Sequence, residues 1–119
     1  MPRRVVVVHD DEGFLAAVTG ALTRAHYDAC SFLDPESALR ALRASETVDL
    51  LISRIAFSAH QPVGLSLARV ARVSVPGLKV LFIALPNYRG DALGLGEFLA
   101  APVSPTKVLR SVVWLLESW

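Results

Sequence analysis

The sequence has little of what marks secreted, nucleic-acid-binding or membrane proteins. It contains one cysteine, Cys30, so it cannot form an internal disulfide, and the apolar neighbours of Cys30 predict a buried structural thiol in a reducing cytoplasm. Twelve basic residues nearly balance eleven acidic ones, and no basic run is longer than Arg3-Arg4. Nucleic-acid binding is not expected, because it requires a basic patch.

Long hydrophobic runs are also missing, although 53% of the residues are hydrophobic. The run Val5–Val8 follows two arginines, as in a signal peptide, but it ends at His9 and is far shorter than a membrane-spanning segment. We therefore expect a cytoplasmic protein that does not contact a membrane. Its 119 residues predict a single, stand-alone domain over residues 1–119, with little room for an output module.

Short apolar runs without alternation predict strands that are covered on both faces of a sheet. The clearest runs are Val5–Val8, Leu50–Ile52 and Val80–Ile83, and the weaker ones are Ala29–Phe32 and Glu97–Ala100. Because helical patterns separate these runs, we expect an α/β fold, a doubly wound parallel sheet with helices on both faces.

Helix signals agree with this alternation. The first predicted helix runs from Phe14 to Ala25, and a second follows the N-cap Asp34. A third is expected from Gly64 to about Val75, and the last follows the cap Ser104. Sites in such folds lie at the carboxyl ends of the strands. Six residues of interest fall there: His9, Asp10, Asp11, Arg54, Ala84 and Ala101.

The sequence contains none of the common catalytic patterns, so an enzyme is not expected. The three histidines have no metal-ligand spacing, and a local hydrogen bond is expected for His9. The glycines between Gly90 and Gly96 are too loosely spaced for a phosphate loop, and the acidic turn after Val8 disfavours a flavin or nucleotide. No serine lies in a nucleophile-elbow pattern.

Several segments together resemble the receiver domain of bacterial response regulators. The stretch VVVVHDDE at residues 5–12 resembles the opening of that domain, and Val48–Arg54 resembles its acceptor strand. Val80–Ala84 and Phe98–Pro102 resemble its fourth and fifth strands, and Val63–Leu65 resembles the turn into its third helix. The resemblance covers nearly the whole chain. It implies a CheY-like, flavodoxin-like sheet with strand order 2-1-3-4-5 and a place in two-component or phosphorelay signalling.

In receivers of this family, two acidic residues and an acceptor aspartate hold magnesium, while a hydroxyl and a lysine contact the phosphoryl group. The corresponding residues here, in that order, are His9, Asp10, Arg54, Ala84 and Ala101. Only Asp10 keeps the required residue type. The resemblance therefore implies a pseudo-receiver that is not phosphorylated and holds neither magnesium nor another cofactor.

The guanidinium of Arg54 is expected beside Asp10 and Asp11, in the space that a magnesium ion would otherwise take. One alternative directs Arg54 into solvent. Another shifts the register by one residue, so that Asp10 and Asp11 form a metal pair and Ser53 becomes the acceptor. Two functional alternatives also stay open: phosphate transfer through Asp10 or Asp11 with a metal, and a small-ligand sensor that uses the altered crevice.

The signalling surface of such a receiver is expected to differ as well. The segment between Ala84 and Phe98 is short and glycine-rich, so the fourth helix should be short or missing, and the loop Ile55–Pro62 is longer than in the family. Phe98 corresponds to the family's aromatic switch. On the last helix, Lys107, Arg110 and Trp114 share the face opposite the core. We expect this surface to bind a protein: a signalling kinase, a regulator or a second copy of the chain.

Overall fold

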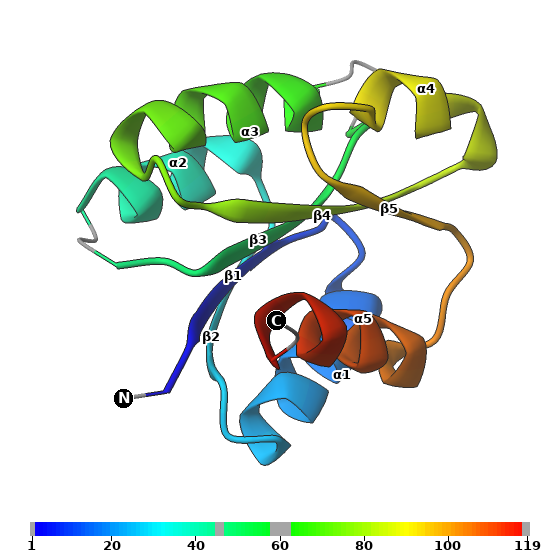
Figure 1. Cartoon of the computed structure of the whole chain (residues 1–119). Coiled ribbons are helices and arrows are strands. Elements are labelled where there is room, and N and C mark those ends of the chain that lie inside the picture. The colour runs from blue at the N-terminus through cyan, green and yellow to red at the C-terminus, as the bar shows by residue number, and fades with distance from the viewer. Residues whose placement is uncertain (1, 45–46, 58–62, 118–119) are drawn as a thin grey trace.

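The computed structural model describes residues 2–44, 47–57 and 63–117. In this part of the chain, a central sheet of five parallel strands has the order β2-β1-β3-β4-β5 (Figure 1). The strands are β1 (Arg4–Val8), β2 (Asp28–Phe32), β3 (Leu50–Arg54), β4 (Lys79–Ala84) and β5 (Glu97–Ala100). The predicted fold class and strand order are confirmed.

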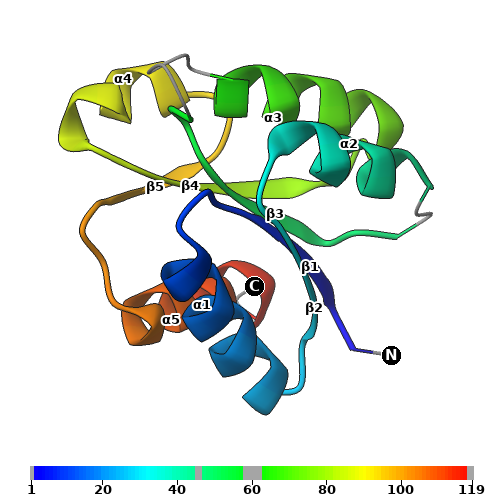
Figure 2. The ribbon, with the colours of Figure 1, turned by 180° about the vertical axis from the view of Figure 1, so that it is seen from behind.

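Helices cover both faces of the sheet. They are α1 (Glu12–Arg24), α2 (Pro35–Ala44), α3 (Val63–Ser74), α4 (Arg89–Ala92) and α5 (Pro105–Glu117). Figure 2 shows α1 and α5 together on one face and α2 and α3 together on the other. Within the described ranges, no helix has the length and apolar character needed to cross a bilayer.

Two apolar cores lie against the two faces, because successive side chains of a strand point to opposite sides. Val5 and Val7 pack with the buried residues of α1 and α5. Val6 and Val8 pack with those of α2 and α3. Since both faces of β1 are buried, the strand needs an uninterrupted apolar sequence.

The helix caps fix where the chain turns away from the strand ends. α1 begins at Glu12, two residues before the predicted Phe14, because the Asp11 carboxylate accepts a hydrogen bond from the Phe14 amide and caps the helix. The predicted caps Asp34 and Ser104 are confirmed, since their side-chain oxygens accept backbone N–H groups at the starts of α2 and α5.

Cys30 is exposed, so the prediction of a buried thiol is wrong. The residue lies on β2, an edge strand of the sheet, where Asp28, Cys30 and Ser31 are all exposed. Apolar neighbours in the sequence do not bury a side chain when no strand or helix covers that side of an edge.

The fourth helix is short, as predicted. α4 has 4 residues and follows a 3₁₀ turn at Pro86–Tyr88. Gly94 then adopts a positive φ of 81°, a conformation that glycine reaches without strain. The expected lengthening of the loop after Ile55 involves residues 58–62, which lie outside the described residues.

Gly64 allows α3 to begin directly against the end of β3. Its N–H donates to the Ile55 carbonyl at 2.9 Å. A Cβ at this position would lie 1.8 Å from the carbonyl oxygen of Arg54, which no native packing allows. The backbone of Arg54 is thus held in place by a contact that only glycine permits.

We expect Gly64→Ala to destabilise the protein by about 2 kcal/mol or more, because the added methyl group must displace the backbone of β3 or α3. Urea unfolding measures the change. Gly77→Ala is the matched control, since a Cβ at Gly77 meets nothing within 4 Å. Equal unfolding free energies for the two variants would contradict this interpretation.

Candidate functional site

A cavity of about 270 Å³ opens at the carboxyl ends of the strands. Five of the six residues that the sequence predicted at these ends line it: His9, Asp11, Arg54, Ala84 and Ala101. Asp10, the sixth, is not in the lining but is bonded to Arg54. The structure therefore brings all six residues into one neighbourhood.

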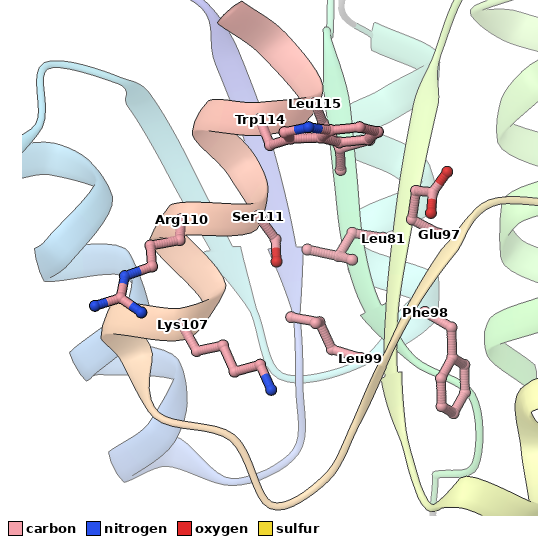
Figure 3. A pocket seen from close by; sticks show the side chains of 9 residues that line it. All are labelled: Leu81, Glu97, Phe98, Leu99, Lys107, Arg110, Ser111, Trp114 and Leu115. Atoms are coloured by element: carbon pink, nitrogen blue, oxygen red, sulfur yellow. The ribbon is translucent and has the colours of Figure 1, made fainter. Parts of the chain in front are cut away.

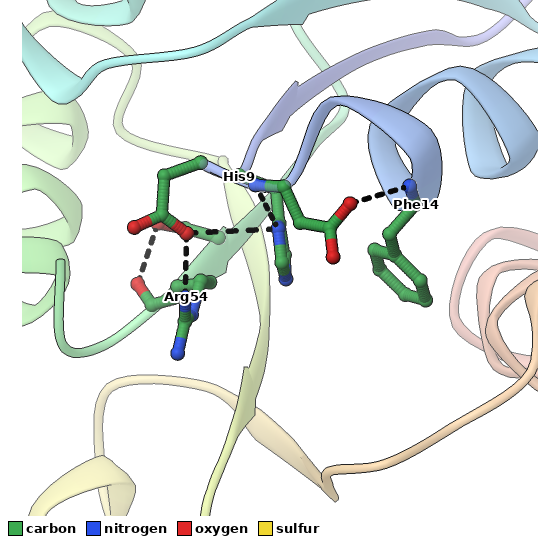
Figure 4. A network of polar contacts seen from close by, with 6 residues as sticks. His9, Phe14 and Arg54 are labelled. Atoms are coloured by element: carbon green, nitrogen blue, oxygen red, sulfur yellow. Dashed lines mark hydrogen bonds and ion pairs between the residues drawn. The ribbon is translucent and has the colours of Figure 1, made fainter.

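Arg54 forms an ion pair with Asp10. The Nη1 of Arg54 donates to Oδ1 of Asp10 at 2.5 Å, and the two side chains are 35% and 37% exposed (Figure 4). The alternative in which Arg54 extends into solvent is therefore wrong. The pair joins the end of β3 to the residues that follow β1, across two neighbouring strands.

Asp11 does not share this pairing, although the sequence predicted Arg54 beside both carboxylates. Instead, its Oδ1 accepts the Phe14 amide at 3.1 Å as the cap of α1. The reason is local, because an N-cap side chain turns back toward the free N–H groups of its own helix. Among the residues that the structure describes, the carboxylate partner of Arg54 is Asp10.

His9 has the local hydrogen-bonding role expected of it. Its Nδ1 accepts the backbone N–H of Asp11 at 3.0 Å, and its ring centroid lies 4.7 Å from that of Phe14. Because an amide N–H only donates, Nδ1 carries no proton, and the proton of the neutral ring is on Nε2. Burial, and then the positive charge of Arg54, lower the pKa of His9, so the ring is neutral at pH 7.

Ser53 is fully buried and does not line the cavity. It pairs in register with Val8 and Phe82, which belong to the core beneath α2 and α3, and its hydroxyl donates to the Arg54 carbonyl at 2.7 Å. The shifted register that would make Ser53 an acceptor is therefore wrong. β3 presents Arg54, and not Ser53, at the site.

The remaining walls are apolar. Ala84 and Ala101 are joined by a backbone hydrogen bond of 2.8 Å from the N–H of Ala101 to the carbonyl of Ala84. Sequence reasoning did not name the other apolar lining residues, which are Phe14, Ile83, Leu85, Pro102 and Val103. Their position beside the ends of β1, β4 and β5 is the signal that could have identified them. Among the described residues, no group of three His, Cys, Asp or Glu side chains could hold a metal ion.

A second hollow, of about 460 Å³, lies between β5 and α5 (Figure 3). Lys107, Arg110 and Trp114 line it from α5, and Glu97 and Leu99 line it from β5. We call this hollow the β5–α5 groove. Trp114 is 63% exposed, so the predicted exposure of this side chain is confirmed.

Phe98 also lines the groove, but its ring packs against the other core, on the far face of the sheet. There the Arg89 guanidinium lies 4.7 Å from the ring centroid. Lys107, Arg110 and Trp114 therefore form one surface, and the Phe98 side chain belongs mainly to the face beside α4. Ser118 and Trp119, which follow α5 in the sequence, lie outside the described residues.

Comparison with known proteins gives structural similarity without sequence similarity. No family model matches the chain, and no curated protein sequence does. Among solved structures, a response regulator receiver protein from Sinorhizobium medicae superimposes with a TM-score of 0.83 at 19% identity, covering 98% of this chain and 96% of that one.

Two further structures agree. The chemotaxis response regulator CheY4 of Vibrio cholerae has a TM-score of 0.83 at 20% identity, covering 98% of this chain and all (100%) of that one. The response regulator TrrA of Thermotoga maritima, solved in complex with Mg(2+)-BeF, has a TM-score of 0.81 at 21% identity, covering 96% and 99%. At these identities the similarity establishes the fold, which is that of CheY-like response-regulator receiver domains.

Proposed function

We propose that this protein is a receiver-like component of two-component or phosphorelay signalling, formed as one domain over residues 1–119, that is not phosphorylated and acts by binding another protein. The observation that carries the proposal is the ion pair between Arg54 and Asp10. The signalling context is an inference from the fold, whereas the loss of phosphorylation is argued from the site.

Phosphoryl transfer in receivers needs an acceptor carboxylate and positive charges that neutralise the transferred group. A guanidinium cannot form the acyl phosphate that an acceptor carboxylate forms, and it stays charged at every physiological pH. Placed on Asp10, it takes up a carboxylate that would otherwise bind magnesium and repels the incoming dication. Ala84 and Ala101 provide neither a hydroxyl nor an ammonium group to the cavity.

Without a phosphate, nothing at the acceptor position shifts the protein between two surface states. We therefore propose that its binding surface is constant. The β5–α5 groove fits this role because an exposed tryptophan beside lysine and arginine is typical of binding hot spots. The partner is then a signalling kinase, a regulator or a second copy of the chain.

The first prediction is chemical. Treatment with acetyl phosphate and magnesium should leave the intact mass unchanged, because the cavity has neither the acceptor nor the lysine. Mass spectrometry under non-acidic conditions measures this. A stoichiometric gain of one phosphoryl group that disappears in Asp10→Asn or Asp11→Asn would overturn the proposal in favour of phosphate transfer through those carboxylates.

The second prediction concerns the ion pair as an internal counter-ion. In a double-mutant cycle of Asp10→Ala and Arg54→Ala, we expect a coupling free energy of about 1 kcal/mol, because both groups are partly shielded from solvent. The matched control is the Glu36–Arg40 pair on α2, whose side chains are 84% and 71% exposed.

The control pair should couple by at most about 0.5 kcal/mol, since surface pairs are well screened. Urea unfolding of the single and double variants gives both coupling energies. Strictly additive effects of Asp10→Ala and Arg54→Ala would show that the pair does not stabilise the site.

The third prediction concerns the groove. Trp114→Ala should weaken partner binding by about 1–3 kcal/mol while leaving the unfolding free energy nearly unchanged, because the side chain is mostly exposed. Val113→Ala is the matched control, since Val113 is an exposed apolar residue of the same helix that does not line the groove.

Sedimentation equilibrium measures the affinity if the partner is a second copy, and titration calorimetry measures it for another protein. The affinity should not depend on acetyl phosphate or magnesium. Equal affinities for wild type and Trp114→Ala, or a higher affinity with the phosphodonor, would refute this part of the proposal.

A further inference from the structure

We propose that the cavity at the strand ends binds a small zwitterion, an apolar α-amino acid, whose carboxylate meets Arg54 and His9 and whose ammonium meets Asp11. The inference rests on the proposal above that magnesium and phosphate do not occupy this space. It adds a ligand site to a protein otherwise proposed to act through its surface alone.

The positive side of the cavity consists of hydrogen-bond donors. Arg54 lines the cavity, whereas its partner Asp10 does not. The guanidinium has five N–H donors, and its hydrogen bond to Asp10 is made through Nη1, so a second carboxylate can also be bound. His9 adds a donor, because the Asp11 amide occupies Nδ1 and leaves the ring proton on Nε2. Figure 4 shows both side chains extending from the strand ends in the same direction.

The negative side is Asp11. One of its carboxylate oxygens, Oδ1, accepts the Phe14 amide, and Oδ2 is available to an ammonium group. With His9 neutral, the charged groups that line the cavity are Arg54, whose guanidinium is also bonded to Asp10 behind the lining, and Asp11. A zwitterion matches both charges. A simple carboxylate would lie near the like-charged Asp11, and a simple amine would lie near the like-charged Arg54.

The other walls suit an apolar side chain. Ala84, Ala101 and Val103 line the cavity with small aliphatic groups, and Phe14 adds an aromatic ring. Leu85 also lines it while remaining 56% exposed, so an occupant would cover a large apolar side chain that is now partly in water. A few charged groups that orient a ligand within apolar walls are the usual composition of a small-molecule site.

The size of the cavity limits the ligand. Its volume of about 270 Å³ lies just below the range of roughly 300–1,000 Å³ found for drug-sized molecules. A single amino acid fits this limit, whereas a nucleotide or a flavin does not. Ala101 directly follows β5, so an occupant would touch the first residue after the strand that borders the β5–α5 groove.

The test is a titration of ¹⁵N-labelled protein, followed by two-dimensional NMR, with three compounds of matched shape. L-leucine carries both charges, 4-methylpentanoate lacks the ammonium group, and 3-methylbutylamine lacks the carboxylate. We expect L-leucine to bind with a Kd between about 10 μM and 1 mM, with shifts at Ala84 and Ala101. Each analogue should bind at least about tenfold more weakly.

Two variants assign the charges. Asp11→Asn keeps the cap of α1, because asparagine is also a good N-cap. The variant should bind L-leucine about tenfold more weakly, because the ammonium group loses its charged partner. Its affinity for 4-methylpentanoate, which has no ammonium group, should not fall by a similar factor. Asp34→Asn is the matched control, since Asp34 caps α2 and does not line the cavity. It should bind L-leucine as the wild type does. Ala101→Leu, which fills the cavity, should abolish the shifts.

No saturable shifts with L-leucine up to about 10 mM would overturn the inference. So would equal binding of all three compounds, or an Asp11→Asn variant that binds L-leucine normally. These outcomes are separate from the phosphorylation test. A gain of phosphoryl mass would defeat the proposed function whether or not L-leucine binds, whereas an unchanged mass without L-leucine binding would defeat only the ligand site.

Discussion

The central strands β1 and β3 are buried on both faces of the sheet, and this constraint decides where polar chemistry can lie. Within each strand, an ionised side chain would have to enter one of the two apolar cores, which costs several kcal/mol without a partner. Charged groups are therefore confined to the strand ends, where His9, Asp10 and Arg54 occur. Because parallel strands end along the same edge, residues far apart in the sequence meet there.

At that edge, the protein carries its own cation. A bound metal ion can be absent, exchanged or removed by chelators, but a guanidinium at the end of β3 is present whenever the chain is folded. The close approach of Gly64 to the Arg54 carbonyl holds the backbone of this residue in place, and the hydrogen bond to Asp10 holds its guanidinium. The guanidinium therefore supplies a positive charge at this edge without a bound ion.

Much of this structure could be predicted from the sequence, because burial on both faces leaves a clear apolar pattern. The strand order, the caps Asp34 and Ser104, and the meeting of the six site residues followed from that pattern and from the resemblance to receivers. The side-chain partners did not. Whether Asp11 turns toward Arg54 or toward its own helix depends on how a loop closes. The exposure of Cys30 was missed for a different reason: the predicted order already placed β2 at an edge of the sheet, but burial was judged from the apolar neighbours of Cys30 in the sequence.

β5 is a short strand whose successive side chains belong to two different surfaces of the molecule. Glu97 and Leu99 line the groove beside α5. Phe98 lies between them in the sequence, but its ring packs on the other face of the sheet, against Arg89. Since neighbouring residues point to different faces, substitutions at Glu97 or Leu99 can change the shape and charge of the groove while the packing beside α4 stays as it is. On such a strand, a single substitution can remodel one surface of the molecule and leave the opposite surface unchanged.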